Sequence, residues 1–393
     1  MHSFFPAKRI LMGPGPSDVP QRVLDAMARP TLGHLDPEFQ RMMEEVKGGL
    51  KALFKTENEL TFPVSAPGSA GMETCFLNLV EEGDAVIVVK NGVFGERMRE
   101  NVVRAGGTAV VVDVEWGKAP GLDAIEAALT AHPEAKILAF VHAETSTGVL
   151  ADAAGICALA QAHDCLTIMD AVTSLGGVPV YIDKWGVDAA YSGSQKCLSC
   201  APGLSPVTFS ERALDKLRGR KTPVRSWFLD LSLVMNYWNS EGGRSYHHTA
   251  PVNGLYGLHE ALVMLNEEGL EIAWARHAQM HKALAAGLES MGLKFLVDED
   301  VRLPQLNAVI VPEGVDEASV RAHLLEAYDL EIGAGLGPMA GKVWRIGLMG
   351  SSASQENVDL CITALVDALN RHQYSVDGSK ALIAAQSEMR PSS

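Results

Sequence analysis

The chain lacks several features that would assign it to a membrane, secreted or organellar class. No apolar run approaches the ~20 residues of a transmembrane helix. The first residues, MHSFFPAKRILMGPGPS, lack the apolar stretch and cleavage site of a secretion signal, and the last, EMRPSS, are not a peroxisomal signal. Six cysteines in 393 residues are too few for a disulfide framework. We therefore expect a cytoplasmic protein without a membrane partner.

The sequence also lacks an excess of positive charge. Its formal net charge is −15 and its isoelectric point is about 5.3. Nucleic acids and anionic membranes attract basic surfaces, so neither is an expected partner. Hydrophobic residues make up 47% of the chain and charged residues 21%, an ordinary globular composition. The composition and length fit a soluble enzyme that acts on small metabolites.

Short apolar runs alternate with helix-like stretches between residues 60 and 210. The runs predicted to be strands are 84–90, 108–114, 135–144, 165–174 and 188–194. This alternation predicts an α/β fold whose mainly parallel sheet lies between helices and binds ligands at the carboxyl ends of its strands. Longer helices and spaced strands after about residue 255 predict a smaller α+β domain. The predicted parts are an N-terminal arm (1–14), a large domain (15–267), a small C-terminal domain (268–375) and a tail (376–393).

Three features at predicted strand and helix ends suggest a site for pyridoxal phosphate. Asp170 ends the apolar run LTIMD, and Lys196 follows the next strand-like run. The segment PVSAPGSAGME (63–73) opens a helix whose backbone amides could bind a phosphate. The cofactor needs a lysine for its carbonyl, a carboxylate for its pyridine nitrogen and a phosphate cradle. Each feature alone is weak, because most lysines are solvated surface groups.

Several motifs in order resemble a known family. They are LMGPGPSDVP (11–20), HAETSTGV (142–149), MDAVTSLGG (169–177), YSGSQK (191–196), LRGRKT (217–222), YHHT (246–249) and GLGPMAGKVWRIGLMG (335–350). The chain resembles the class V aminotransferases over residues 8–370, specifically the alanine–glyoxylate and serine–pyruvate aminotransferase group. That resemblance implies fold type I of the pyridoxal-phosphate-dependent transferases and a homodimer.

The resemblance also implies roles for individual residues. Lys196 would form the internal aldimine and move the substrate proton, and Asp170 would pair with the pyridine nitrogen. The other implied cofactor contacts are Gly68, Ser69, Phe94, Thr145, Val172 and Gln195, with Tyr246 and Thr249 reaching the site of the partner subunit. Pro67 departs from the Ser-Gly-His that the family often carries before the phosphate. Without the resemblance, Phe94 could be a core residue, and Thr145 and Gln195 could be turn caps.

An arginine in an apolar run predicts an anionic partner. Arg345 lies in VWRIGLMG, and a buried guanidinium is costly unless it pairs with an anion such as a carboxylate. A structural salt bridge would serve equally, but the resemblance favours the substrate carboxylate, with Gly15 beside it. His34 borders the site in relatives, where serine or glutamine also occurs. Tyr246 differs from the asparagine of ureidoglycine–glyoxylate enzymes, which argues against that activity.

Cys197 and Cys200 directly follow the predicted lysine. A zinc site would need two further ligands at suitable spacing, and a redox pair expects a different context, so we interpret both as packing residues and expect no metal site. Cys361 lies in a helical pattern, which disfavours a cysteine desulfurase.

The resulting hypothesis is a ping-pong aminotransferase that passes the amino group of alanine or serine to glyoxylate or pyruvate. Its alternatives are transamination of taurine or ureidoglycine, and a non-catalytic dithiol or metal-binding protein.

Overall fold

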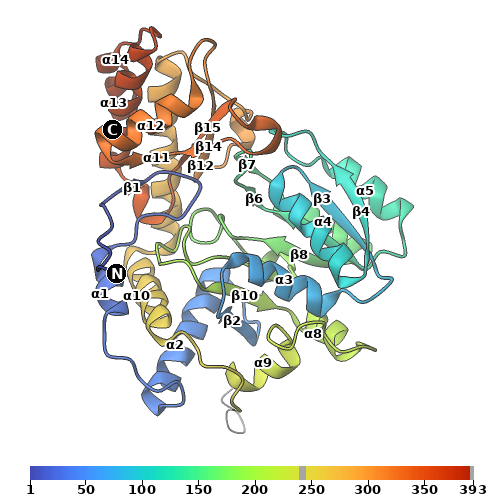
Figure 1. The fold of residues 1–393 in the computed structure, drawn as a ribbon. Helices are drawn as coiled ribbons and strands as arrows, with labels where there is room; N and C mark the ends of the chain where they lie inside the picture. The colour runs from blue at the N-terminus through green and yellow to red at the C-terminus, as the bar shows by residue number, and fades with distance from the viewer. Residues whose placement is uncertain (239–244, 390–393) are drawn as a thin grey trace.

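A seven-stranded sheet forms the centre of the larger part of the molecule. The computed structural model describes residues 1–238 and 245–389. The strand order is β2-β10-β9-β8-β5-β3-β4, and β10 runs in the direction opposite to the other strands. The sheet is therefore mainly parallel, as predicted. The strands are β2 (Leu60–Val64), β3 (Ala85–Lys90), β4 (Thr108–Asp113), β5 (Ile137–Val141), β8 (Leu166–Asp170), β9 (Ala189–Tyr191) and β10 (Ser205–Phe209). Figure 1 shows strands of this sheet behind helices that cover one of its faces.

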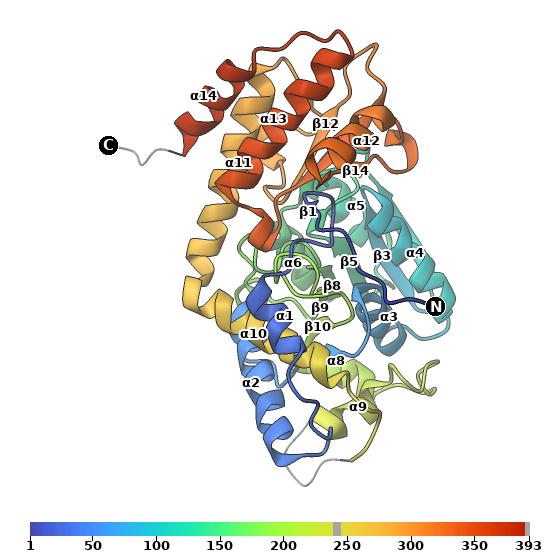
Figure 2. The same cartoon turned by 60° about the vertical axis from the view of Figure 1, so that its left-hand side comes forward.

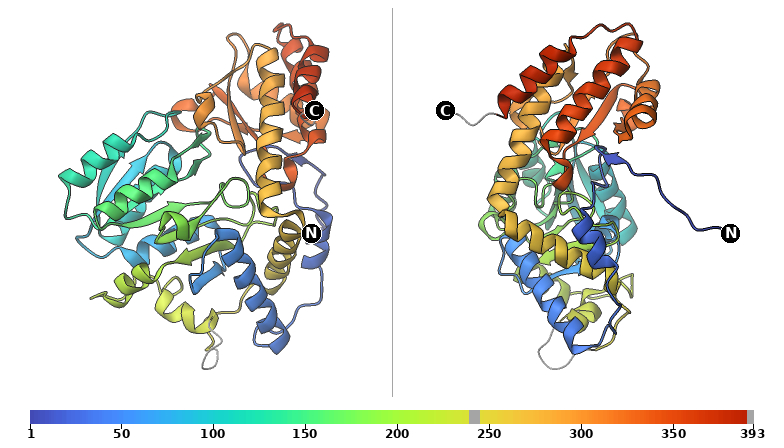
Figure 3. Two further views of the ribbon diagram at one scale, coloured as in Figure 1. Left: turned by 180° about the vertical axis from the view of Figure 1, so that it is seen from behind. Right: turned by 90° about the vertical axis from the view of Figure 1, so that its left-hand side faces the viewer.

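Helices cover both faces of this sheet because its central strands are apolar on both sides. Every residue of β5 and β8 is buried, so neither face can meet water. Helices α3 and α4 pack side by side on one face, and α5 and α6 pack together on the other (Figures 1 and 3). Their bounds are α3 (Gly68–Leu79), α4 (Val93–Ala105), α5 (Leu122–Ala131) and α6 (Ala153–Ala162).

The remaining helices of this part flank the sheet and its edge. Helix α2 begins at Pro37, and the Asp36 side chain accepts a hydrogen bond of 2.8 Å from the Glu38 amide as its N-cap. It packs against β2 and α10. The bounds are α1 (Gln21–Met27), α2 (Pro37–Phe54), α7 (Ile182–Trp185), α8 (Glu211–Arg218), α9 (Leu231–Trp238) and α10 (Val252–Glu268).

The C-terminal part has its own sheet and its own hydrophobic core. Four antiparallel strands lie in the order β11-β12-β15-β14 and pack with α11 to α14 (Figure 2). Gly269, with φ 88° and ψ 127°, separates α10 from α11. The bounds are α11 (Leu270–Ser290), β11 (Lys294–Phe295), β12 (Leu306–Ile310), α12 (Glu317–Tyr328), β13 (Leu330–Glu331), β14 (Gly333–Ala334), β15 (Val343–Gly347), α13 (Gln355–Arg371) and α14 (Gly378–Glu388), with short 3-10 turns at Glu299–Val301, Gly337–Met339 and Gly350–Ser352.

The N-terminal segment connects the two parts of the molecule. Strand β1 (Ile10–Leu11) pairs in parallel with β13, and the Gly347 amide donates to the Met12 carbonyl at 2.7 Å. A small hairpin, β6 (Ala143–Glu144) and β7 (Val149–Leu150), lies at the same junction. Residues 1–8 extend away from the body (Figure 3). Among the described residues, no helix is long and apolar enough to cross a bilayer.

Candidate active site

A cavity of about 220 Å³ lies at the carboxyl edge of the large sheet, where β2, β8 and β9 end. Eight residues predicted from the sequence line it: Gly68, Ser69, Phe94, Thr145, Asp170, Val172, Gln195 and Lys196. Six further residues complete its wall: Pro67, Met72, Arg97, Ala143, Thr173 and Tyr191. The lysine and the carboxylate that the sequence singled out therefore face one cavity.

The Asp170 carboxylate is buried and held by two donors. Its Oδ2 accepts from the Tyr191 hydroxyl at 2.8 Å, and its Oδ1 accepts from the Val172 amide at 2.8 Å. Burial raises the pKa of Asp170 to about 7, and these hydrogen bonds act in the opposite direction. Asp170 and Tyr191 are partners in register on the parallel strands β8 and β9. Tyr191 was not predicted as a site residue, because nothing within one strand reveals its neighbour across the sheet.

Lys196 is 9% exposed and lies on the loop after β9. Its Nζ donates to the carbonyl oxygen of Pro14, which comes from the N-terminal segment. Ser17 fixes the same loop through two hydrogen bonds. Its hydroxyl donates to the Lys196 carbonyl at 2.7 Å, and its amide donates to the Gln195 carbonyl at 2.9 Å. Burial lowers the pKa of Lys196 to about 8, so the amine is more readily deprotonated than an ordinary lysine.

The N-terminus of α3 forms another part of the cavity wall. Gly68 and Ser69 are its first two residues, and Pro67 is the N-cap without a capping side chain. Pro67 itself has no N–H to donate, but the amides of Gly68 and Ser69 in the first turn of α3 remain free to bind an anion. Gln195 Oε1 is buried in the same wall without a protein hydrogen-bond partner among the described residues.

These groups fit pyridoxal phosphate. The cofactor presents a carbonyl, a ring nitrogen and a phosphate, and the cavity offers an amine, a buried carboxylate and a helix N-terminus at separate places. The Gln195 side-chain amide has a buried polar atom without a protein partner among the described residues, and its N–H groups can donate to a phosphate in the same wall.

Phe94 and Arg97 lie one turn apart at the start of α4 and both line the cavity. The Arg97 guanidinium carbon lies 4.9 Å from the centroid of the Phe94 ring, within the range of a cation–π contact. Arg97 was not predicted, since an exposed arginine on a helix is normally an ordinary solvated residue.

Arg345 lies on β15, 6% exposed, at the junction of the two parts. Its Nε donates to Ala334 O at 2.6 Å and its Nη1 donates to Thr145 O at 3.1 Å. No carboxylate among the described residues is within ion-pair distance of it. Burial lowers its pKa to about 10, and the nearby Glu144 acts in the opposite direction. A buried guanidinium that meets only carbonyl oxygens remains available for an anionic ligand.

Five predicted residues are not among those that line the cavity: Gly15, His34, Tyr246, Thr249 and Arg345. Gly15 and Arg345 contact residues of its wall, whereas the other three lie further away. The His34 and Tyr246 rings contact each other with centroids 5.4 Å apart, and Tyr246 is 62% exposed. Thr249 lies further along the same segment, next to His248, whose Nε2 is 2.7 Å from the Ser65 hydroxyl. This segment therefore approaches the chain between β2 and α3 from outside.

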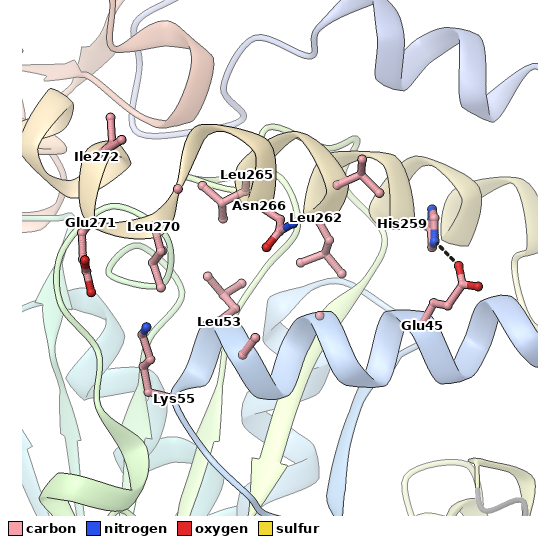
Figure 4. Close-up of a pocket in the computed structure, with 14 residues that line it drawn as sticks. Glu45, Leu53, Lys55, His259, Leu262, Leu265, Asn266, Leu270, Glu271 and Ile272 are labelled. Atoms are coloured by element: carbon pink, nitrogen blue, oxygen red, sulfur yellow. Dashed lines mark hydrogen bonds and ion pairs between the residues drawn. The ribbon is translucent and has the colours of Figure 1, made fainter.

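A larger cavity, about 620 Å³, lies between α2 and α10 and is a different kind of surface (Figure 4). Leucine side chains from both helices line it, and His259 Nε2 and Glu45 Oε2 are 2.8 Å apart at one end. Its only lysine among the described lining residues is the exposed Lys55. It lacks the buried amine and carboxylate pair, so the smaller cavity is the candidate active site.

The two cysteines after Lys196 are buried and unpaired. Cys197 Sγ donates to Thr173 O at 3.2 Å, and burial raises the pKa of Cys197 and of Cys200 to about 12. Thiols of that kind are poor nucleophiles and poor metal ligands. Among the described residues, no group of three or more histidine, cysteine or acidic side chains is placed to hold a metal ion.

Gly15 packs directly against the Lys196 amine and supports a first testable prediction. Its φ is +103°, and a Cβ there would overlap Lys196 Nζ, Cδ and Cε. We expect Gly15→Ala to lower kcat by about 100-fold, because it would displace the amine by roughly an ångström. Gly33→Ala is the matched control, since no atom lies within 4 Å of its Cβ position. Steady-state kinetics check the effect, and a fully active, normally folded Gly15→Ala would contradict it.

A mainly parallel sheet with a buried lysine and carboxylate at its carboxyl edge defines a transferase of the pyridoxal-phosphate-dependent fold class. Comparison with known proteins narrows this further, because the family Aminotransferase class-V matches residues 9–360. The chain belongs to the class-V aminotransferases, as the motif resemblance predicted.

Individual relatives match over nearly the whole chain. An alanine–glyoxylate aminotransferase of Oryctolagus cuniculus is 41% identical over 363 residues, which are 92% of this chain and 92% of that protein. The crystal structure of an alanine–glyoxylate aminotransferase from Nostoc sp. is 45% identical, with a TM-score of 0.92 over 94% of this chain and 97% of the other. The crystal structure of a ureidoglycine–glyoxylate aminotransferase from Bacillus subtilis is 37% identical, with a TM-score of 0.96 over 99% and 100%.

Proposed function

We propose that this aminotransferase uses pyridoxal phosphate to move the amino group of a small amino acid, alanine or serine, to glyoxylate or pyruvate in two half-reactions. The observation that carries the proposal is the shared cavity of Lys196 and Asp170, with the unpaired Arg345 guanidinium beside the Thr145 wall. The names of the Oryctolagus cuniculus and Nostoc relatives support the choice of glyoxylate as acceptor and alanine as donor.

Each residue has a distinct part in this proposal. When bound, the cofactor supplies an electron sink for amino-group transfer. Lys196 would bind its carbonyl carbon and afterwards carry the substrate α-proton, for which a pKa of about 8 suits a general base. Asp170, oriented by Tyr191, would hold the proton of the ring nitrogen. The backbone amides of Gly68 and Ser69 and the side-chain N–H groups of Gln195 would donate to the phosphate, and Phe94 and Val172 would enclose the ring.

The size of the cavity supports small substrates. About 220 Å³ is below the roughly 300–1,000 Å³ of typical small-molecule sites, and the cofactor itself would fill much of it. Beside Lys196, the backbone of Pro14 and Gly15 borders the site, and it offers a carbonyl oxygen and no polar side chain for a larger substrate. Arg345 would hold the carboxylate that every 2-amino and 2-oxo acid carries. Gly15 and His34 are proposed as further residues bordering the substrate.

Transamination of ureidoglycine is the second candidate. The observation that favours it is the match to the Bacillus subtilis enzyme, which is 37% identical over nearly all of both chains. Tyr246 weighs against it, because ureidoglycine–glyoxylate enzymes carry asparagine at this position. Taurine is a weaker candidate, because it carries a sulfonate in place of the carboxylate that Arg345 would grip in a fork of two parallel hydrogen bonds.

We extend the proposal to a homodimer in which Tyr246 and Thr249 complete the partner's site. The exposed Tyr246 ring, and its position outside the cavity of its own chain, support this arrangement.

The proposed location is the cytoplasm, which six free and buried cysteines support. The domain limits 15–267 and 268–375 remain proposals, supported by the two hydrophobic cores and the break at Gly269.

The near-visible absorption of the purified protein tests this function. We expect a yellow protein whose band bleaches when L-alanine or L-serine is added and returns when glyoxylate or pyruvate follows. Taurine should leave the band in place, and D-alanine is the control for a specific carboxylate and amine geometry. A protein that stays colourless with added pyridoxal phosphate would overturn the proposal, and bleaching by taurine alone would replace its donor.

A further inference from the structure

Glu144 is a fully buried carboxylate that does not line the cavity and has no part in the proposed chemistry. It ends strand β6 with 0% exposure. Its Oε1 accepts from the Ser146 hydroxyl at 2.6 Å and from the Ser146 amide at 3.0 Å, and its Oε2 accepts from the Phe94 amide at 3.1 Å. Burial raises its pKa, and the bonds from Ser146, Phe94 and Gly95 act in the opposite direction. A buried carboxylate with this many donors has a defined orientation.

Two of the donors that Glu144 accepts from, the amides of Phe94 and Gly95, belong to the first turn of α4. The N-cap of α4 is Gly92, which has no side chain to bind the free amides. The Ser146 hydroxyl accepts from the Val93 amide at 3.0 Å, and Glu144 accepts from the Phe94 amide. Two residues of a distant hairpin thus replace the missing cap, and a carboxylate at a helix N-terminus is also favoured by the helix dipole.

Gly92 is required for this arrangement. A Cβ at Gly92 would overlap Ser146 Oγ and the Glu144 side chain, so only glycine lets the hairpin reach the helix. Glycine at the N-cap therefore leaves α4 without a cap of its own and also makes room for the cap that Ser146 and Glu144 provide.

The capped start of α4 supplies two residues of the cavity wall. Phe94 and Arg97 both line it, and they lie on the first turns of α4. The residue after Glu144 is Thr145, which lines the cavity and whose carbonyl accepts from Arg345. Residues 144 and 145 therefore contact both the first turn of α4, through the Glu144 carboxylate, and Arg345, through the Thr145 carbonyl.

We propose that Glu144 is a positioning residue, which caps α4 from the β6–β7 hairpin and thereby sets the place of Phe94 against the cofactor. This inference rests on the proposed function, because it concerns the affinity of the cavity for pyridoxal phosphate. Glu144 acts through Phe94 and contacts neither substrate nor cofactor.

An electrostatic effect of Glu144 on the phosphate would have the opposite sign. The cofactor carries a negatively charged phosphate, so removal of a nearby negative charge would by itself tighten its binding. Loss of the cap would loosen the first turn of α4 and weaken binding. The direction of the change in affinity therefore separates the two roles.

The test compares Glu144→Gln, Glu144→Ala and Ser146→Ala with Glu96→Gln. Glu96 lies on the same helix, but it is partly exposed and pairs with Arg99, so its variant loses a charge without touching the cap. The dissociation constant of pyridoxal phosphate is measured by absorbance with the apo-protein. We expect weakening of about 10- to 100-fold for Glu144→Ala, about 3- to 10-fold for Glu144→Gln and Ser146→Ala, and less than 2-fold for Glu96→Gln.

Two further measurements separate positioning from general damage. In a Phe94→Leu background, Glu144→Gln should weaken binding by less than 2-fold, because its effect passes through the ring. Hydrogen exchange of the apo-protein should rise by about 10-fold or more in the peptide covering residues 93–97 and stay unchanged in α5. This exchange readout needs neither cofactor nor activity.

The outcomes distinguish the inference from the function on which it rests. Tighter binding in Glu144→Gln, full additivity with Phe94→Leu, or faster exchange without any change in affinity would overturn the positioning role while the aminotransferase stands. A wild-type protein that binds no pyridoxal phosphate would overturn the function and the positioning role together, and the exchange data would then show a cap of structural importance only.

Discussion

Lys196→Ala should abolish transamination, with a fall in kcat of at least about 10⁴-fold, and should remove the near-visible absorption band of the bound cofactor. The substitution deletes both the amine that would bind the cofactor carbonyl and the base that would carry the α-proton. No other amine can take its place, since Lys196 is the sole lysine among the described residues that line the cavity. The protein should still fold, because the rest of the Asp170 and Tyr191 arrangement is untouched.

Borohydride reduction of the loaded protein gives an independent measure of this prediction. It should fix the cofactor to the peptide that contains Lys196 in the wild type and to no peptide in the variant, as mass spectrometry would show. The control is Lys282→Ala, which removes an exposed lysine of α11. Retention of the band and of ordinary turnover by Lys196→Ala would assign the chemistry to another group.

Asp170→Asn should lower kcat by roughly 10²- to 10³-fold and at the same time stabilise the apo-protein at alkaline pH. An amide cannot hold the proton of the pyridine nitrogen as a carboxylate does. The stability effect follows from the pKa of about 7, well above the ordinary 3.8, which burial causes. The folded protein therefore binds this proton more tightly than the unfolded chain, so the stabilising contribution is complete below about pH 4 and is lost as the pH rises through 7.

The sign of this effect makes it measurable by thermal unfolding. The difference in Tm between Asp170→Asn and wild-type apo-protein should increase from pH 5.5 to pH 8, by roughly 2 °C or more, since only the wild type must ionise a buried carboxyl. Asp123→Asn, at an exposed position of α5, should show no such trend. A constant Tm difference across this range would mean that Asp170 is already ionised at low pH.

Local sequence patterns were sufficient for the fold class and for the residues at strand ends. Asp170 closes an apolar run and Lys196 follows the next one, so the parallel-sheet rule alone brings them to one edge. Arg345 stood out because it interrupts an apolar strand. The roles of these residues remain predictions, but the structure shows that Lys196 and Asp170 share a cavity.

The parts that the sequence could not reveal depend on contacts between distant segments. Tyr191 reaches Asp170 through strand register, and Glu144 caps a helix that begins some 50 residues earlier. The Pro14 carbonyl is a backbone atom that meets a lysine 182 residues away. None of these contacts leaves a periodic or compositional trace, because any residue can offer a carbonyl and many can offer a hydroxyl or carboxylate. Only the three-dimensional arrangement identifies them.

The pairing of β1 with β13 has a consequence for how the chain acquires its structure. Ile10 lies opposite Leu330, so a strand made at the start of synthesis has no partner until about 320 further residues have followed. The large sheet can assemble earlier, because its parallel strands lie within residues 60–209. Contacts of such long sequence separation form slowly. We therefore expect refolding to show a late phase in which the N-terminal segment docks and Lys196 first becomes fixed under Pro14.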